Sequence, residues 1–599
     1  MEKQNHQPSV VALVVGVTGM AGLSLAQALK HPDCLGGPWK VYGAARSQPT
    51  WFPPSTVDHF IAFDAVDSAS THSNLSPIAH EVTHLFWVTV QFPGDEEANV
   101  AVNTTMLHNV LTTLKSSPSS RLSHVTLQTG TKHYMGPIQD PTRSNQLVGH
   151  EPPFHEDMPR LPYPNFYYAL EDLLASHAPS LTYSVHRSSI IIGASSRSGH
   201  NALVMVGAYA AVCRHLGVPF RYPGNRYTWE HFCDMTDARM VGLNIAQALK
   251  KPDCKGGPWK VYGAARRPPP ATWFPASIVD DFISFDAVDA ATTQASLSPI
   301  AHEVTHLFWV ALQFQEDEEA NIATNKGMLH NVLTTLKSSP ASRLTHVTLQ
   351  TGTKHYMGPI FDPARSTQLL SHDPPFHEDM PRLPYPNFYY AQEDLLASHA
   401  PSLTYSVHRS SIIIGASSRS AINALVKLGA YAAVCRHLRL PFRYPGTRYT
   451  WEHFCDMTDS EVLAQQHVWA AVTDKAKNQA FNCTNGDLFT WKRMWKVLSE
   501  LFDVEFVGFG ENDEDRVDVV EFMRDKDEIW DEIVEKYGLV KTKLKEFAYY
   551  EALKVVLHFD FQHVSSMNKS KEYGFFGHAN TFKRVTFWVH KLRFMKIIP

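Results

Sequence analysis

A long internal duplication constrains the fold of this 599-residue chain more than any other feature. The stretch TGTKHYMGP begins at Thr129 and PNFYY begins at Pro164, and both recur further along the chain. Lys132 and Tyr167 reappear as Lys354 and Tyr389, each 222 residues later. One hydrophobic core does not grow to this length, so the chain must form at least two domains. The duplication predicts that two of them share one fold.

Alternating apolar runs and helical patterns predict a Rossmann-type α/β fold for the first repeat, with a doubly wound parallel sheet. Residues 9–15 (SVVALVV) form a short β-branched run that is typical of a buried parallel strand. Five more apolar runs that we interpret as strands lie at 39–46, 59–65, 84–90, 123–130 and 181–193.

A glycine-rich turn follows the first run at once, and a helical pattern follows the turn. The turn reads GVTGMAG, and its candidate cofactor-binding residues are Gly16, Thr18, Gly19, Met20 and Gly22. Glycines permit a tight turn and let backbone amides approach a pyrophosphate at the helix N-terminus. The order strand, turn, helix therefore predicts a dinucleotide site, with a purely structural turn as the alternative.

The residue that ends the second strand favours NADP over NAD. Arg46 stands where an NAD site usually has an acidic residue, and a guanidinium can bind the extra 2′-phosphate of NADP. An exposed loop arginine is the alternative. Asp64 ends the third strand and is a candidate for binding adenine or capping the next segment, and Thr129 lies at the ligand-binding end of the fifth strand. The second repeat keeps Arg266 and Asp286 at the matching positions.

The two repeats are unequal. The first covers 1–237 and the second covers 238–459, whereas 460–599 occurs once. The second repeat enters the pattern at Met240, so it lacks the first strand and keeps only Gly242 of the turn. Since the first strand of a Rossmann sheet is central, its loss should leave neighbouring strand edges unpaired. The helical, aromatic-rich C-terminal part is expected to be a substrate lid or a packing subdomain, and short connections favour its packing on the second repeat.

Composition excludes several classes of partner. A formal net charge of −5 and a pI near 6.7 predict no binding to nucleic acid or to an anionic membrane surface. The apolar run from Val10 to Val17 is far shorter than a membrane span of about 20 residues. The seven cysteines include no CxxC pair, and we expect a cytoplasmic protein. His80-Glu-Val-Thr-His84 matches HExxH, but His84 opens an apolar strand, so we expect no metal site.

Six motifs together resemble one family: GVTGMAG, GAAR, LQTGTKHYMGP, PRLPYPNFYY, SVHR and MNKSKEYGFFG. The chain is similar to the progesterone 5β-reductase and iridoid synthase-like enone reductases, a branch of the short-chain dehydrogenase/reductase superfamily. The resemblance covers nearly the whole chain, and it implies an extended Rossmann domain with a smaller helical substrate domain. It also implies NADPH as cofactor and a small-molecule enone, steroid or terpenoid-like, as substrate. A homodimer stays an open alternative.

The resemblance assigns the catalytic pair to Lys132 and Tyr167, and to Lys354 and Tyr389 in the second repeat. The superfamily's usual Tyr-x-x-x-Lys is absent, because Glu171 stands four residues after Tyr167. The implied reaction is 1,4-reduction of an activated C=C bond, with NADPH delivering hydride to the β-carbon. The tyrosine hydroxyl would stabilise the oxyanion by hydrogen bonding, and the lysine would lower the pKa of the phenol.

Ser188 and Ser410 replace the proline that commonly follows SVHR in this family, which bears on substrate range.

Three alternatives to an active enone reductase stay open. An epimerase or dehydratase should carry Tyr-x-x-x-Lys, a non-catalytic NADP(H)-binding protein would typically lose the Lys and Tyr, and a fusion of tandem genes would be partly inactive. Because the glycine turn is complete only once, we expect the first repeat to bind NADPH and the second to bind it weakly or not at all.

Overall fold

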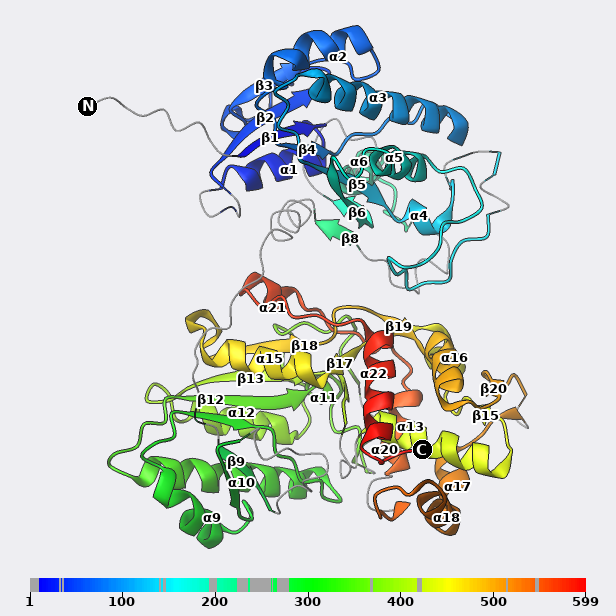
Figure 1. Ribbon diagram of the computed structural model, residues 1–599. Coiled ribbons are helices and arrows are strands. Elements are labelled where there is room, and N and C mark those ends of the chain that lie inside the picture. The colour runs from blue at the N-terminus through cyan, green and yellow to red at the C-terminus, as the bar shows by residue number, and fades with distance from the viewer. Residues whose placement is uncertain are drawn as a thin grey trace. The chain divides into compact units, whose positions relative to one another are not determined.

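The chain forms two compact units, Met1–Asp253 and Cys254–Pro599, called here the first and second unit (Figure 1). The computed structural model describes residues 10–31, 34, 37–138, 140, 142–143, 147–192, 202–222, 235–237, 260, 262–266, 279–362, 364–366, 370–416, 423–512, 515–544 and 549–599. The start of the second repeat at Met240, including Gly242, lies outside these residues. Among the described helices, none is long and apolar enough to cross a lipid bilayer.

The first unit contains a six-stranded parallel sheet in the order β3-β2-β1-β4-β5-β6. Its strands are β1 (Val10–Val15), β2 (Trp39–Ala45), β3 (His59–Ala62), β4 (His84–Trp87), β5 (His124–Gly130) and β6 (Thr182–Ser188). β1 lies between β2 and β4, and Ala12, Leu13 and Val14 are fully buried. The strand order reverses beside β1, as in a Rossmann fold, and the predicted fold class of the first repeat is confirmed.

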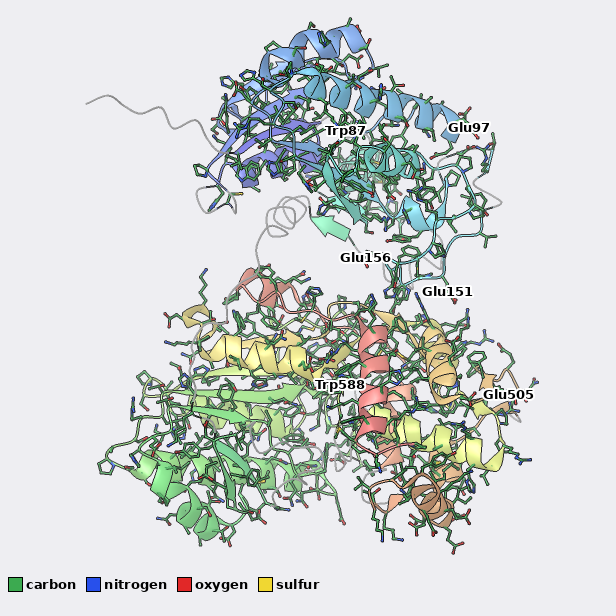
Figure 2. The ribbon with its side chains drawn as sticks, in the orientation of Figure 1. Trp87, Glu97, Glu151, Glu156, Glu505 and Trp588 are labelled. Carbon is green, nitrogen blue, oxygen red and sulfur yellow. The ribbon has the colours of Figure 1, made fainter. Side chains whose placement is uncertain are left out.

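Helices cover both faces of this sheet because successive residues of β1 point to opposite sides. The other elements of the unit are α1 (Met20–Leu29), α2 (Ser68–Leu75), α3 (Glu96–Ser116), α4 (Lys132–Met135), α5 (Phe166–Ala175), β7 (Ile190–Ile192), α6 (Ala202–Leu216) and β8 (Met235–Asp237). Leu13 packs in a core with α3 and α5, which also encloses Trp87 (Figure 2), whereas Ala12 and Val14 pack against α1. Short 3-10 helices lie at Pro54–Thr56 and Ser76–Ile78.

In the second unit the same sheet is split at the place of the missing first strand. β9 (Tyr262–Ala265) and β10 (Asp281–Ser284) form a separate pair, and the four-stranded sheet has the order β11-β12-β13-β18. The four strands are β11 (His306–Trp309), β12 (His346–Gly352), β13 (Thr404–Ser410) and β18 (Gln479–Cys483). Among the described strands β11 pairs only with β12, and Phe308 is 38% exposed where its counterpart Phe86 is 2% exposed. The predicted unpaired edges are therefore present.

The C-terminal part, residues 460–599, packs on the second repeat. β18 extends the sheet at β13, and α15 lies over β12 and β13 (Figure 1). A large core joins α13 to α16, α18, α20 and α22, with Trp495 and Trp530 fully buried. The helices are α9 (Ala290–Leu297), α10 (Glu318–Ser338), α11 (Lys354–Met357), α12 (Phe388–Ala397), α13 (Ala424–Leu438), α14 (Arg448–Glu452), α15 (Ser460–Ala471), α16 (Trp491–Phe502), α17 (Val519–Met523), α18 (Asp527–Tyr537), α20 (Tyr550–Leu557), α21 (Asn568–Glu572) and α22 (Thr581–Phe594). The small strands are β14 (Ile412–Ile414), β15 (Phe442–Arg443), β16 (Phe454–Cys455), β17 (Met457–Asp459), β19 (Phe489–Thr490) and β20 (Phe506–Val507).

Candidate active site

The first unit places Lys132 and Tyr167 at the carboxyl end of β5. Lys132 begins α4 directly after this strand, and Tyr167 is the second residue of α5. Asn165 joins the two segments. Its side-chain oxygen accepts a hydrogen bond from the Tyr167 N–H (3.0 Å), and its amide donates to the Lys132 carbonyl (3.2 Å). The pair therefore lies where ligands bind in a doubly wound sheet.

A buried carboxylate that the sequence analysis missed holds the two segments in place. Glu96, in the first turn of α3, forms an ion pair with the Lys132 ammonium and is fully buried. One of its oxygens also accepts the backbone N–H of Phe166 (2.8 Å), beside Tyr167. The Lys132 nitrogen lies 4.2 Å from the centre of the Phe166 ring. The available signal was the DEEAN motif, because it recurs unchanged in the second repeat at 317–321.

The electrostatics of this pair correct one expectation. Burial lowers the pKa of Lys132, although its ion pair with Glu96 opposes the shift. Burial raises the pKa of Tyr167, and the charge of Glu96 raises it further. The prediction that the lysine lowers the pKa of the phenol is wrong, because the ammonium is paired with Glu96. Tyr167 is instead a neutral phenol at physiological pH, and a neutral phenol donates hydrogen bonds.

The Tyr167 hydroxyl is available to a ligand. It makes no hydrogen bond to any residue that the structure describes. A Cβ added at Gly130, at the end of β5, would lie 3.3 Å from the hydroxyl oxygen, so a side chain there would crowd it. Thr129, the preceding residue, is buried and donates its hydroxyl to the His186 carbonyl (3.4 Å). Ser188, at the family's proline position, accepts a hydrogen bond from Gln128 (2.6 Å).

The glycine turn has the form that a pyrophosphate requires. Gly16 has φ +98°, and a Cβ there would lie 2.9 Å from the Val88 carbonyl oxygen, so only glycine fits. Gly22 packs so closely on the Gly16 carbonyl that a side chain would collide with it. Gly19 is the N-cap of α1 and supplies no side-chain acceptor, which leaves the first amides of the helix for an anion. Met20 begins α1 and is buried, and Thr18 lies within the turn.

Arg46 and its counterpart differ between the units. Arg46 follows β2, is exposed, and has no hydrogen-bond or ion-pair partner among the described residues, so its guanidinium is free to bind a phosphate. Arg266 is already bound to Asp286 (2.9 Å) and to Gln313 (2.5 Å). Asp64 accepts the N–H of Val66 (3.1 Å) in the turn after β3, whereas the N-cap of α2 is Asp67.

The second unit repeats the geometry of the Lys–Tyr pair. Lys354 forms an ion pair with the buried Glu318, and its nitrogen lies 5.8 Å from the centre of the Tyr389 ring. Burial lowers the pKa of Lys354 to about 8 and raises that of Tyr389. The described residues of this unit include no counterpart of Gly16 or Gly19. The second unit therefore has the pair without the complete glycine turn.

Glu171 occupies the position of the lysine in the usual Tyr-x-x-x-Lys arrangement. It is 8% exposed and forms ion pairs with Arg160 (3.2 Å) and with Arg187 (3.3 Å), the arginine of SVHR. The position is therefore part of a charged network that fixes α5 against β6.

The C-terminal part reaches the Lys354 segment through a histidine that the sequence analysis also missed. The Nε2 atom of His563 lies 2.7 Å from the Thr353 hydroxyl, and both residues are buried. His563 also lines a small aromatic cavity with Tyr449, His453, Phe454, Trp491, Phe559 and Phe561. A lid in this part would therefore lie directly against the loop that carries the lysine.

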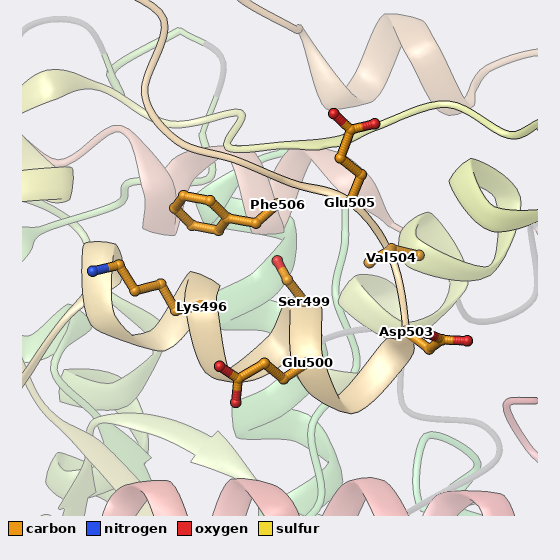
Figure 3. Close-up of a pocket in the computed structure, with 7 residues that line it drawn as sticks. All are labelled: Lys496, Ser499, Glu500, Asp503, Val504, Glu505 and Phe506. Carbon is orange, nitrogen blue, oxygen red and sulfur yellow. The ribbon is translucent and has the colours of Figure 1, made fainter.

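Figure 3 shows a different hollow, between α16 and the segment leading to β20. It is lined by Lys496, Ser499, Glu500, Asp503, Val504, Glu505 and Phe506. Neither the catalytic pair nor the glycine turn contributes to it, so it is not the active site.

Comparisons with known proteins identify the family of the chain. A family model described as a PRISE-like Rossmann-fold domain matches residues 68–300 and 284–599. A 3-oxo-Δ(4,5)-steroid 5β-reductase from Arabidopsis thaliana is 43% identical over 363 residues, 60% of this chain and 91% of that protein. An (S)-8-oxocitronellyl enol synthase from Catharanthus roseus is 43% identical over 362 residues, 60% of this chain and 90% of that protein. A short-chain dehydrogenase/reductase superfamily protein from Agrobacterium tumefaciens, solved with bound NAD, aligns with a TM-score of 0.35 at 12% identity, over 65% of this chain and 94% of that one.

Proposed function

The chain belongs to the PRISE-like Rossmann-fold family of NAD(P)-binding proteins, and on that premise we propose that it reduces the C=C bond of an activated enone with NADPH. The observation that carries the proposal is the placement of Lys132, Glu96 and Tyr167 at the carboxyl end of β5, in the unit with the complete glycine turn. The steroid and 8-oxocitronellyl names of the two relatives support a steroid or terpenoid-like substrate.

The cofactor-binding residues of the first unit fit NADPH. The turn from Gly16 to Gly19 and the first amides of α1 would hold the pyrophosphate. Arg46 would bind the 2′-phosphate that distinguishes NADPH from NADH. Thr129 would border the nicotinamide end of the site. When bound, NADPH supplies the hydride for the β-carbon of the substrate.

Tyr167 carries the electrostatic part of the reaction. As hydride reaches the β-carbon, negative charge grows on the carbonyl oxygen, and a neutral phenol can donate a hydrogen bond to it. Burial keeps the phenol protonated, and its free hydroxyl is the donor. Lys132 acts as a positioning residue, since its charge is held by Glu96 and its carbonyl accepts the amide of Asn165. Solvent can then protonate the α-carbon.

We further propose that reduction takes place in the first repeat, 1–237, that 238–459 is a cofactor-poor copy, and that 460–599 is the substrate lid. The contrast between the free Arg46 and the occupied Arg266 supports this division.

Product analysis tests the proposed reaction. The purified full-length chain is incubated with NADPH and 2-cyclohexenone, and the products are identified by gas chromatography. Cyclohexanone is the expected product, and its formation should require Tyr167. Formation of the allylic alcohol would contradict 1,4-reduction. NADPH binding without turnover of any enone would instead support a non-catalytic NADP(H)-binding protein.

A further inference from the structure

The first unit exposes an apolar surface on α6 and an open edge on β6, the outer strand of its six-stranded sheet. Nine large apolar side chains on or just after α6 are at least 36% exposed: Val204, Met205, Val206, Tyr209, Val212, Leu216, Val218, Phe220 and Tyr222. Among the described strands β6 pairs only with β5, and none of its residues is buried. We call α6 and the edge of β6 together the uncovered face. Apolar patches and open strand edges of this kind mark interaction sites.

The second unit shows what such a face binds. β13 has the same sequence as β6, TYSVHRS, and its residues from Ser406 to Ser410 pair with β18 of the C-terminal part. All residues of α13 from Ala424 to Cys435 are buried, in a core formed with α16, α18, α20 and α22. Tyr550 of α20 also donates a hydrogen bond to the backbone of α13 (3.3 Å, to the Lys427 carbonyl). The complementary surface for the uncovered face is therefore residues 460–599.

The two helices differ at only two positions, and one difference favours the first unit. Lys427 and Leu428 of α13 stand where α6 has Met205 and Val206. Lys427 is 1% exposed and forms no ion pair among the described residues, and burial lowers its pKa to about 7. A methionine at this place carries no charge to desolvate and adapts its shape to the gap. The C-terminal part should therefore fit α6 at least as well as α13.

We propose that the uncovered face docks residues 460–599 of a second molecule of this chain. β18 of that molecule extends the sheet at β6, and its α16, α18, α20 and α22 cover α6. The surface that would cover α6 and β6 is the one that covers α13 and β13 in the second unit, so docking requires the C-terminal part to leave its own second unit. Two molecules therefore exchange it reciprocally. In the exchanged dimer the two C-terminal parts cover the two α6 helices instead of the two α13 helices, so the number of covered helices does not change. The Lys427 side chain of each molecule, which is buried on α13, returns to water.

The exchanged dimer would unite the separated halves of the site. One unit would then hold the glycine turn, the pair Lys132 and Tyr167, and a lid whose His563 faces Thr131, the counterpart of Thr353. This benefit to catalysis rests on the proposed function, whereas the docking itself does not and is tested without any activity.

Paired cysteines test the docking. In the second unit a Cβ added at Gly429 would lie 3.0 Å from the Cδ1 atom of Ile598, and Gly207 is the counterpart of Gly429 on α6. Two full-length chains are co-expressed, one carrying Gly207→Cys and the other Ile598→Cys, and disulfide-linked peptides are identified by mass spectrometry after mild oxidation. A single chain carrying Gly429→Cys and Ile598→Cys is the matched control for the unexchanged arrangement. The mass of the unmodified chain is measured in parallel by light scattering.

The proposal expects a 207–598 disulfide between the two chains and a dimeric mass for the unmodified protein. Adding Met205→Lys to the Gly207→Cys chain should reduce this cross-link several-fold. A monomeric mass with only the 429–598 cross-link overturns the proposal. A third preparation is a single chain that carries both Gly207→Cys and Ile598→Cys. If the 207–598 disulfide forms within that chain and not between the two co-expressed chains, the partner is not a second molecule and the proposal is overturned. Failure of enone reduction would change none of these readouts.

Discussion

The Lys132 ammonium and the Glu96 carboxylate form a buried ion pair that connects the lysine segment to the helix of Tyr167. The carboxylate binds the ammonium and also accepts the N–H of Phe166, so one side chain fixes both halves of the site. Lys354 and Glu318 repeat the arrangement in the second unit. Removing one member of a buried pair leaves the other charge unpaired, which is strongly destabilising.

Replacing Glu96 with Gln should therefore lower the free energy of unfolding of the first unit by about 3–5 kcal/mol. Denaturant unfolding followed by tryptophan fluorescence measures the change. Glu97→Gln is the matched control, because Glu97 is its exposed neighbour and binds Arg143 at the surface. That control should change stability little, because solvent and salt screen an ion pair at the surface. Equal effects of the two substitutions would show that the buried pair has no special role.

Tyr167→Phe should lower kcat for enone reduction roughly 10²- to 10³-fold, because the donor to the developing oxyanion is lost. Steady-state kinetics under saturating NADPH measure this loss. Tyr389→Phe removes the same hydroxyl from the unit without the complete turn and should leave kcat unchanged. If Tyr389→Phe abolished turnover and Tyr167→Phe did not, the second unit would be the catalytic one.

Arg46→Ala should weaken NADPH binding roughly 10- to 100-fold, because a charge-assisted hydrogen bond to the 2′-phosphate is removed. Binding of NADH, which lacks this phosphate, should be almost unaffected. Fluorescence titration with both cofactors measures the ratio. Arg266→Ala is the control, since Arg266 is held by Asp286 and should not touch the cofactor. A parallel loss of NADH affinity in Arg46→Ala would assign the arginine a structural role.

Acid should destabilise the first unit through His84. Burial lowers the pKa of His84 to about 4, whereas an unfolded histidine titrates near pH 6.5. Between these values the unfolded chain binds the additional proton, so stability falls as pH drops from 6.5 towards 4. His84→Gln should remove about 1–3 kcal/mol of this loss and leave the pH dependence above 7 unchanged. Denaturation midpoints of the wild type and the variant are measured from pH 4 to pH 8. If both proteins lose the same stability between pH 6.5 and pH 4, His84 is not the cause.

The first strand, the glycine turn and the helix after it could be predicted from sequence because their patterns are local. A β-branched run, glycines at the turn and helical spacing need no knowledge of distant residues. The split sheet could also be predicted, because the second repeat lacks the strand that would pair with both β9 and β11, as β1 pairs with both β2 and β4.

The partners of the site residues could not be predicted. Glu96 lies 36 residues before Lys132, and only the tertiary fold shows that the two are paired. The pKa of Tyr167 was assigned the wrong direction for the same reason, since the charge on the lysine already had a partner. Arg46 and Arg266 occupy matching motifs, yet only the structure shows that Asp286 and Gln313 bind one of them. Local patterns predict elements, whereas charge pairing depends on contacts between segments distant in sequence.

The central claim is that a chain with two Lys–Tyr pairs has one complete cofactor site, in the first unit. Calorimetric titration of the purified full-length protein with NADPH tests it most directly. The account predicts one NADPH bound per chain, with the signal lost when Gly19 is replaced by a bulky residue. Two equivalents per chain, or one equivalent that survives this substitution, would contradict it.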